Sequence, residues 1–241
     1  LKEHQSKGAE VMIALDVSNS MLARDYSPNR LERAKLAISR LVDKLDGDRV
    51  GLVLFAGTSF VQLPITTDYV SAKMFLGNIS TESIPVQGTA IGDAINTCIR
   101  SFSAQSEKSR AIIVITDGEN HEDDPVAAAK QAADMGIMVY TIGVGSQQGQ
   151  PIPMKNGLLK DSEGNIVVTK LDENTLEKVA KAGNGAYVHA GNDEFGLNPV
   201  INDIRKLDEE EFKSIVFEEY DEQFMYFFAI ALGLLVIQML I

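Results

Sequence analysis

The chain alternates short runs of apolar, often β-branched residues with segments whose apolar positions recur every three or four residues. Unbroken apolar runs of this length are typical of strands buried on both faces of a sheet. Pro64, inside one run, suits a strand at the sheet edge or the end of a strand, because proline cannot donate to an inner ladder. The predicted strands are "EVMIALD" (10–16), "DRVGLVLFA" (48–56), "SFVQLPI" (59–65), "RAIIVITD" (110–117), "IMVYTIGVG" (137–145) and "GAYVHA" (185–190).

The segments between these runs have the periodicity of amphipathic helices. Ser27 and Pro28 suit the start of the first helix, and Asp124 and Pro125 suit the start of the fourth. Gly136 follows the fourth helix, at a position where glycine commonly ends one. The predicted helices span 27–45, 67–79, 88–105, 125–135, 172–183 and 195–212.

Strands that alternate with helices imply right-handed crossovers and a sheet covered on both faces. The sequence therefore predicts an α/β fold with a Rossmann-like, doubly wound, mainly parallel sheet. One segment breaks the alternation: "PIPMKNGLLKDSEGNIVVTK" (151–170) contains Asn-Gly and Gly-Asn pairs typical of tight turns. We interpret it as a small β-hairpin insertion.

The C-terminal segment differs in kind from the rest. "FMYFFAIALGLLVIQMLI" (224–241) carries no charge, and as a helix it would be about 27 Å long, near the thickness of a bilayer core. We expect a transmembrane helix at 224–241 that the sequence end cuts short, an acidic linker at 207–223, a domain at 10–206 and a lead-in at 1–9. No signal peptide opens the sequence, so we expect a piece of a longer protein.

Composition limits the function classes. The net charge of −12 argues against nucleic acid as a partner, because a phosphate-binding face needs clustered Lys and Arg. The single cysteine, Cys98, cannot form an intrachain disulfide, and its helical spacing with Ile95 and Phe102 indicates a packed thiol.

Carboxylates and hydroxyls gather where the carboxyl ends of the strands should meet. Asp16 and Asp117 each end an apolar strand, and Ser18 and Ser20 follow Asp16 at alternate positions. Thr89 lies in a glycine-flanked loop that can reach the same edge, where open α/β sheets bind ligands. An all-oxygen set with few charges suits Mg²⁺, with Mn²⁺ or Ca²⁺ as alternatives. We expect Ser18, Ser20 and Thr89 to touch the metal and the two aspartates to act mainly through water.

Capping and turn chemistry could explain each of these residues singly, because Asp and Ser commonly end strands and begin helices. It does not explain their placement at three separated points of one predicted sheet edge. We therefore favour the metal site.

"DVSNS", the "GT" loop and "TDG" together resemble the von Willebrand factor A (VWA) domain and its metal-ion-dependent adhesion site. The family pattern of Asp-x-Ser-x-Ser, a distant Thr and a distant Asp fits Asp16, Ser18, Ser20, Thr89 and Asp117 in order. The resemblance implies that the metal accepts an Asp or Glu side chain from a protein partner.

Longer stretches resemble one branch of that family. "DVSNSMLARDYSPNRLERAK", "GLVLFAGTSFVQLPITTDY", "QGTAIGDAI" and "ITDGENHED" are similar to the bacterial aerotolerance (Bat) membrane proteins, of the BatB or BatA type. This resemblance implies other Bat proteins and a MoxR-type ATPase system as partners, in an envelope or oxidative-stress role. It also implies an inner-membrane location with the domain outside the cytoplasm.

Two other functions remain alternatives. The first is a scaffold whose metal is purely structural. The second is a metal-dependent hydrolase, which we disfavour: Ser18 stands where an aspartyl phosphatase needs a second Asp, no G-x-S-x-G elbow is present, and the histidines lack metal-ligand spacing. We therefore expect a binding protein and not an enzyme.

Overall fold

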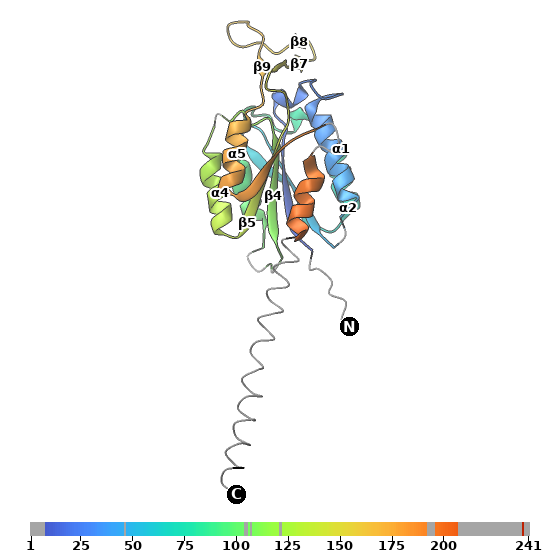
Figure 1. Cartoon of the computed structure of the whole chain (residues 1–241). Helices are drawn as coiled ribbons and strands as arrows, with labels where there is room; N and C mark the ends of the chain where they lie inside the picture. The colour runs from blue at the N-terminus through green and yellow to red at the C-terminus, as the bar shows by residue number, and fades with distance from the viewer. Residues whose placement is uncertain are drawn as a thin grey trace.

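The computed structural model describes residues 8–45, 47–103, 106, 108–120, 122–191, 196–206 and 238. In this part of the chain a six-stranded sheet is covered by helices on both faces (Figure 1). The strand order is β10-β5-β4-β1-β2-β3, and every neighbouring pair is parallel except β2 and β3. The predicted Rossmann-like, mainly parallel α/β sheet is confirmed, and the proline-containing strand lies at the edge.

The elements follow the predicted order. The strands of the sheet are β1 (Glu10–Asp16), β2 (Arg49–Phe55), β3 (Ser59–Thr66), β4 (Arg110–Thr116), β5 (Ile137–Gly143) and β10 (Asn184–His189). The α-helices are α1 (Arg30–Val42), α2 (Tyr69–Gly77), α3 (Ile91–Ser101), α4 (Pro125–Asp134) and α5 (Glu173–Ala182), with a further helix at 197–206. Two short 3-10 helices, η1 (Asn19–Leu22) and η2 (Thr81–Ser83), follow β1 and α2.

Alternate side chains of β1 enter two separate cores. Val11, Ile13 and Leu15 pack on the face covered by α1, α2 and the 197–206 helix. Met12 and Ala14 pack on the other face, beneath α3, α4 and α5. Because both faces are buried, the strand is apolar at every position from Val11 to Leu15 and not only at every second one.

The first helix begins later than predicted. Asn29 is its N-cap, with a side chain that accepts a hydrogen bond from the Glu32 N–H at 2.8 Å. Ser27 and Pro28, the predicted start, lie in the preceding loop. The Arg30 N–H donates to the Ala23 carbonyl at 3.1 Å. This bond closes residues 24–29 into a loop, so the helix does not extend toward Ser27.

The direction of winding reverses between β1 and β4. β2 and β3 extend the sheet on one side of β1, whereas β4, β5 and β10 extend it on the other. Such a switch point leaves a crevice outside the carboxyl ends of the strands, where α/β proteins bind ligands. Leu15 pairs with Ile115 in the ladder, so Asp16 and Asp117 come out at this same point.

The predicted hairpin insertion is confirmed as an arm at residues 150–169, which projects from one end of the domain (Figure 1). β6 (Gln150–Pro151) pairs with β9 (Val168–Thr169), and β7 (Pro153–Met154) pairs with β8 (Gly157–Leu158). The arm begins shortly after the carboxyl end of β5, so it rises beside the switch point.

The predicted acidic linker and transmembrane helix, 207–223 and 224–241, lie outside the described residues except for Gln238. Within the part of the chain that the structure describes, no helix combines the length and apolar character needed to cross a membrane.

Candidate metal centre

Asp16 is fully buried at the end of β1, and two donors fix its carboxylate. Its Oδ1 accepts the Ser18 N–H at 2.8 Å, and its Oδ2 accepts the Thr116 hydroxyl at 2.5 Å. Thr116 is the last residue of β4, so this bond joins the two strands at the switch point. The local turn that Asp16 forms with Ser18 sets the direction of the chain that follows.

Ser18 and Ser20 place their hydroxyls side by side. Their Oγ atoms lie 2.9 Å apart, and Ser18 is only 5% exposed. The N–H of Asn19, between them, donates to Gln87 Oε1 at 2.9 Å, which holds the turn to the neighbouring loop. The alternate serines therefore present two oxygens to one point in front of Asp16.

Thr89 is buried in a loop held against the end of β2. The N–H of the next residue, Ala90, donates to the Ala56 carbonyl at 2.7 Å. Ala56 directly follows Phe55, which pairs with Asp16 in the sheet. This contact brings the Thr89 loop to the carboxyl ends of β1 and β2, as the sequence predicts.

Asp117 is fully buried immediately after β4. Its Oδ2 accepts the Arg30 Nη1–H at 3.0 Å and the Thr169 hydroxyl at 2.9 Å. Its Oδ1 accepts the Glu119 N–H at 3.4 Å. Asp117 thus lies at the predicted edge, but it already has a cationic partner that the sequence analysis did not identify.

That partner, Arg30, is fully buried at the first position of α1. Its Nε and Nη2 donate to the two carboxylate oxygens of Asp25 at 2.8 and 2.7 Å, in a bidentate pair. Burial acts to raise the pKa of Asp25, but the hydrogen bonds and charge of Arg30 and the Ser146 N–H outweigh it and lower that pKa below its usual value. One guanidinium therefore joins Asp25 to Asp117.

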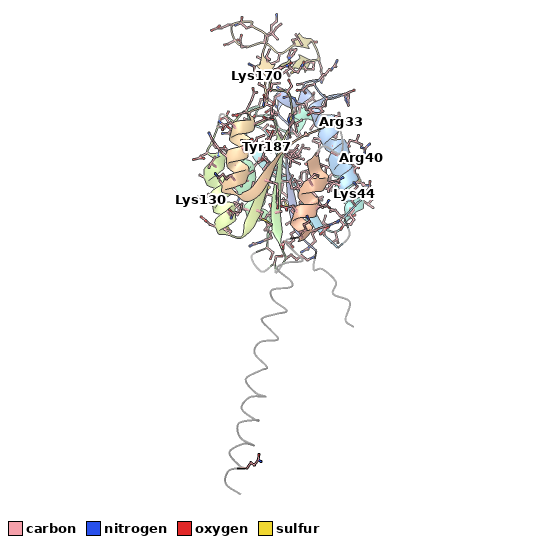
Figure 2. The ribbon with its side chains drawn as sticks, in the orientation of Figure 1. Arg33, Arg40, Lys44, Lys130, Lys170 and Tyr187 are labelled. Carbon is pink, nitrogen blue, oxygen red and sulfur yellow. The ribbon has the colours of Figure 1, made fainter. Side chains whose placement is uncertain are left out.

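Glu119 fastens the arm to this network. Its Oε2 accepts the Thr169 hydroxyl at 3.0 Å, and its Oε1 accepts the Lys170 N–H at 2.9 Å. Figure 2 labels Lys170 at the base of the arm. Thr169, at the end of β9, is fully buried against both Asp117 and Glu119. The arm is therefore anchored at the predicted metal site.

The loop after β4 also fixes the start of α3. Asn120 Oδ1 accepts the Ile91 N–H at 3.2 Å, and Asp123 accepts the Gly92 and Asp93 N–H groups at 3.0 and 2.7 Å. These bonds satisfy the free amides of the helix N-terminus. They also hold the loop of Asp117 next to the loop of Thr89, so the three predicted segments meet at one edge.

The donor set fits a hard divalent cation. In the described residues no three His, Cys, Asp or Glu side chains form a metal cluster, so a metal here would depend on the serine and threonine hydroxyls. Oxygen ligands of this kind suit Mg²⁺, which keeps several waters and needs few charged ligands. Burial and the nearby charge of Asp117 raise the pKa of Asp16 to about 7, against the hydrogen bonds of Thr116 and Ser18. A bound cation would stabilise the ionised Asp16 carboxylate against both of these effects.

The pH dependence of stability tests this electrostatic picture. Because the pKa of Asp16 rises from 3.8 to about 7 on folding, its contribution to stability is complete below pH ~4 and is lost as the pH rises through ~7. In chelator, we expect wild type to lose stability over this range relative to Asp16→Asn, as measured by urea unfolding. Equal pH profiles for the two proteins would contradict the shift. With Mg²⁺ present, we expect the trend to reverse, since the metal needs the ionised carboxylate.

Two other reactive side chains, Cys98 and His189, lie in the part of the chain that the structure describes. Burial raises the pKa of the Cys98 thiol, which is fully buried, as expected for a packed residue. His189, the one histidine among the described residues, contacts the Glu173 carboxylate at 3.2 Å and the Gly145 carbonyl at 3.2 Å. His4 and His121 lie outside the described residues.

Residues 10–198 match the sequence model of the VWA family, the von Willebrand factor type A domain. An uncharacterised protein of Borreliella burgdorferi is 28% identical over 237 residues, which cover 97% of this chain and 69% of that protein. A UPF0353 protein of Nocardia farcinica is 31% identical over 201 residues, and the match spans 58% of its length and 76% of this chain. The chain thus spans little more than half of the second relative.

Two solved structures have a higher sequence identity to this chain than these two relatives. A conserved hypothetical protein, BatB, from Bacteroides thetaiotaomicron is 54% identical with a TM-score of 0.78, over 86% of this chain and all of that one. An aerotolerance-related membrane protein from Bacteroides fragilis is 53% identical with a TM-score of 0.80, over 83% of this chain and all of that one. Proximal thread matrix protein 1 from the mussel byssus, in a structure with a zinc-occupied MIDAS motif, is 19% identical with a TM-score of 0.61. The match covers 84% of this chain and 46% of the mussel protein's chain. At this identity the likeness shows the fold alone.

Proposed function

Because this chain belongs to the von Willebrand factor type A domain family, we propose that its switch-point site binds a divalent cation and, through it, an acidic side chain of a partner protein. One observation carries the proposal. The Ser18 and Ser20 hydroxyls lie 2.9 Å apart, in front of a buried Asp16 and beside the loops of Thr89 and Asp117. Turn chemistry alone gives no reason for these separate segments to converge.

The ion we propose is Mg²⁺, with Mn²⁺ and Ca²⁺ as alternatives. Ser18, Ser20 and Thr89 would bind it directly, and Asp16 and Asp117 would hold its waters and hydroxyl ligands in place. A bound ion would offer an open position to an incoming carboxylate oxygen. The zinc in the MIDAS motif of the mussel protein supports the idea that this fold can hold a divalent metal at such a site.

The site is suited to binding and not to turnover, and we propose that this protein is not an enzyme. Its hydroxyls and carboxylates supply ligands for a cation, and the function needs neither a nucleophile nor a general base. The similarity to BatB and to an aerotolerance-related membrane protein supports a role in a Bat complex, with other Bat proteins and a MoxR-type ATPase system as partners. We further propose a domain spanning 10–206, anchored in the bacterial inner membrane by 224–241 and facing away from the cytoplasm.

Crosslinking followed by affinity purification tests this function. We expect the wild-type chain to capture Bat-family partners in Mg²⁺ and to lose them in chelator. Ser20→Ala should also lose these partners. Its fold should survive, because the substitution removes only a partly exposed hydroxyl. Asp16→Ala gives the same test at the buried carboxylate. If both variants unfold at a lower temperature but capture partners normally, the metal is structural and the scaffold alternative holds. Turnover of a phosphate or ester substrate that depends on metal would favour the hydrolase.

A further inference from the structure

We propose that a groove between the arm and the metal site binds the residues of the partner that flank its metal-bound carboxylate, and that these residues form an extended segment with apolar side chains and a second acidic residue. This inference rests on the proposed function and adds the chemistry of the partner. It follows from the position of the groove, the attachment of the arm and the charges at the rim.

The groove has a volume of about 740 Å³, within the range of pockets that take a small ligand or several side chains. One wall comes from η1 and includes Asn19, which lies between the two serines of the metal site. The second wall comes from the η2 loop, and the third from β7 of the arm. A segment bound to the metal would therefore enter the groove without crossing any other surface.

The apolar side chains of the groove come from all three walls. Leu22, Ile84, Pro85, Pro153 and Met154 line it. Met154 is 38% exposed although it lies on a paired strand, and the arm also exposes Leu158, Ile166 and Val168. Of these four exposed side chains only Met154 lines the groove, where it lies with Pro153 opposite Leu22 and Pro85 and offers an apolar surface to another molecule.

The arm is held firmly enough to form a wall. At its base, Thr169 is fully buried, and its single hydroxyl proton can be donated to either Asp117 or Glu119, whose carboxylate oxygens lie 2.9 and 3.0 Å away. Farther out, the Leu159 N–H donates to the Ile152 carbonyl at 2.9 Å, and Ile152 is 3% exposed. The arm is therefore attached to the metal site at its base, and its own strands are joined to each other farther out.

The rim of the groove carries positive charge on an otherwise acidic chain, whose net charge is −12. Arg24 is exposed, lines the groove, and has no ion-pair partner among the described residues. Lys155 pairs with Glu82 at 2.8 Å across the groove, but both side chains are highly exposed, at 89% and 74%. Such an exposed pair contributes little, so Lys155 can exchange Glu82 for a partner carboxylate. These cations favour an acidic segment.

Selection from a random-peptide library tests the groove. The probe is the library itself, offered to the full 241-residue chain in millimolar Mg²⁺. We expect the enriched peptides to carry an Asp or Glu near an apolar residue and a second acidic residue. Their affinity should fall at least about tenfold in Arg24→Glu and in Met154→Ser, which corresponds to the loss of one good contact. Lys130→Glu on α4, labelled in Figure 2, and Met74→Ser on α2 are the matched controls, because both residues are exposed outside the groove.

The outcomes separate the inference from the function on which it rests. If Ser20→Ala and chelator abolish peptide binding while the two groove variants bind like the controls, the groove is not used and the inference is wrong. If the enriched peptides bind equally well in chelator, the proposed metal-dependent function is itself wrong. Peptides that depend on Mg²⁺ but carry neither an apolar residue nor a second acidic residue beside the first also contradict the inference.

Discussion

Arg30→Met is expected to lower the free energy of unfolding by about 3–5 kcal/mol, the loss typical of a buried ion pair that loses one partner. Arg30 is fully buried, and its guanidinium binds Asp25 through two hydrogen bonds and Asp117 through one. Methionine has a similar reach but no donor. Asp117 would remain fully buried and Asp25 nearly so, without the cation that compensates them.

Arg40→Met in the same helix is the control. Arg40 is exposed on α1 and is labelled in Figure 2, so its loss should change the free energy of unfolding by less than about 0.5 kcal/mol. Urea unfolding of both variants at neutral pH, in chelator, measures the difference. A loss in Arg30→Met no larger than that in Arg40→Met would show that the network does not stabilise the fold.

Arg30→Lys separates charge from geometry. Lysine keeps the positive charge but cannot bind Asp25 through two parallel bonds while also reaching Asp117. We expect a smaller loss of stability than in Arg30→Met, because one carboxylate can still be paired. The remaining loss would measure how much the planar guanidinium contributes by joining the two acids.

The sequence predicted the sheet well because its evidence is local. An apolar run such as 110–117 has few alternatives to a buried strand, and the alternation of strands with helices implies the parallel order. The predicted metal residues also lie at one edge, because the carboxyl ends of parallel strands must meet there. The start of α1 was misplaced, since Ser27 and Asn29 are both good N-caps and the contact of Arg30 with Ala23 decides between them. The start of α3 was misplaced as well, because the helix begins at Ile91 and not at position 88.

The network of Asp25, Arg30 and Thr169 could not be predicted in the same way. Arg30 and Thr169 are 139 positions apart, and nothing in either local pattern indicates that they touch. A charged residue at the first turn of an amphipathic helix is normally solvated, so its burial is visible only in the fold. The available signal was the stretch "ARDYSPNRLERAK", which resembles the Bat proteins beyond the metal motif.

This network also explains how the site can exist before a metal binds. Two buried carboxylates close together would repel one another, but Arg30 compensates Asp117 while Thr116 and Ser18 hold Asp16. The positions of the proposed ligands would therefore be set by the fold and not by an ion. If the proposed metal binds here, a site preorganised in this way would be able to release it without unfolding, as a binding site requires and a structural site does not.

Ser18→Ala is expected to weaken Mg²⁺ binding by at least about 100-fold, because loss of even an outer-sphere partner commonly costs 10–100-fold in metal affinity. The Ser18 Oγ lies 2.9 Å from that of Ser20, so its removal leaves one hydroxyl at the point where the two converge. The fold should survive, since the Ser18 N–H can still donate to Asp16. Titration calorimetry measures the affinity directly.

Thermal unfolding with and without Mg²⁺ gives an independent readout, because a ligand that binds only the folded state raises Tm by mass action. We expect Mg²⁺ to raise Tm in wild type and in Ser162→Ala, a matched loss of a hydroxyl at an exposed position of the arm, but not in Ser18→Ala. Equal rises in all three proteins would place the metal elsewhere and leave the paired serines as turn residues. If Tm fails to rise only in Ser18→Ala, the paired serines are metal ligands. The substitution removes one of the two hydroxyls that lie together in front of Asp16.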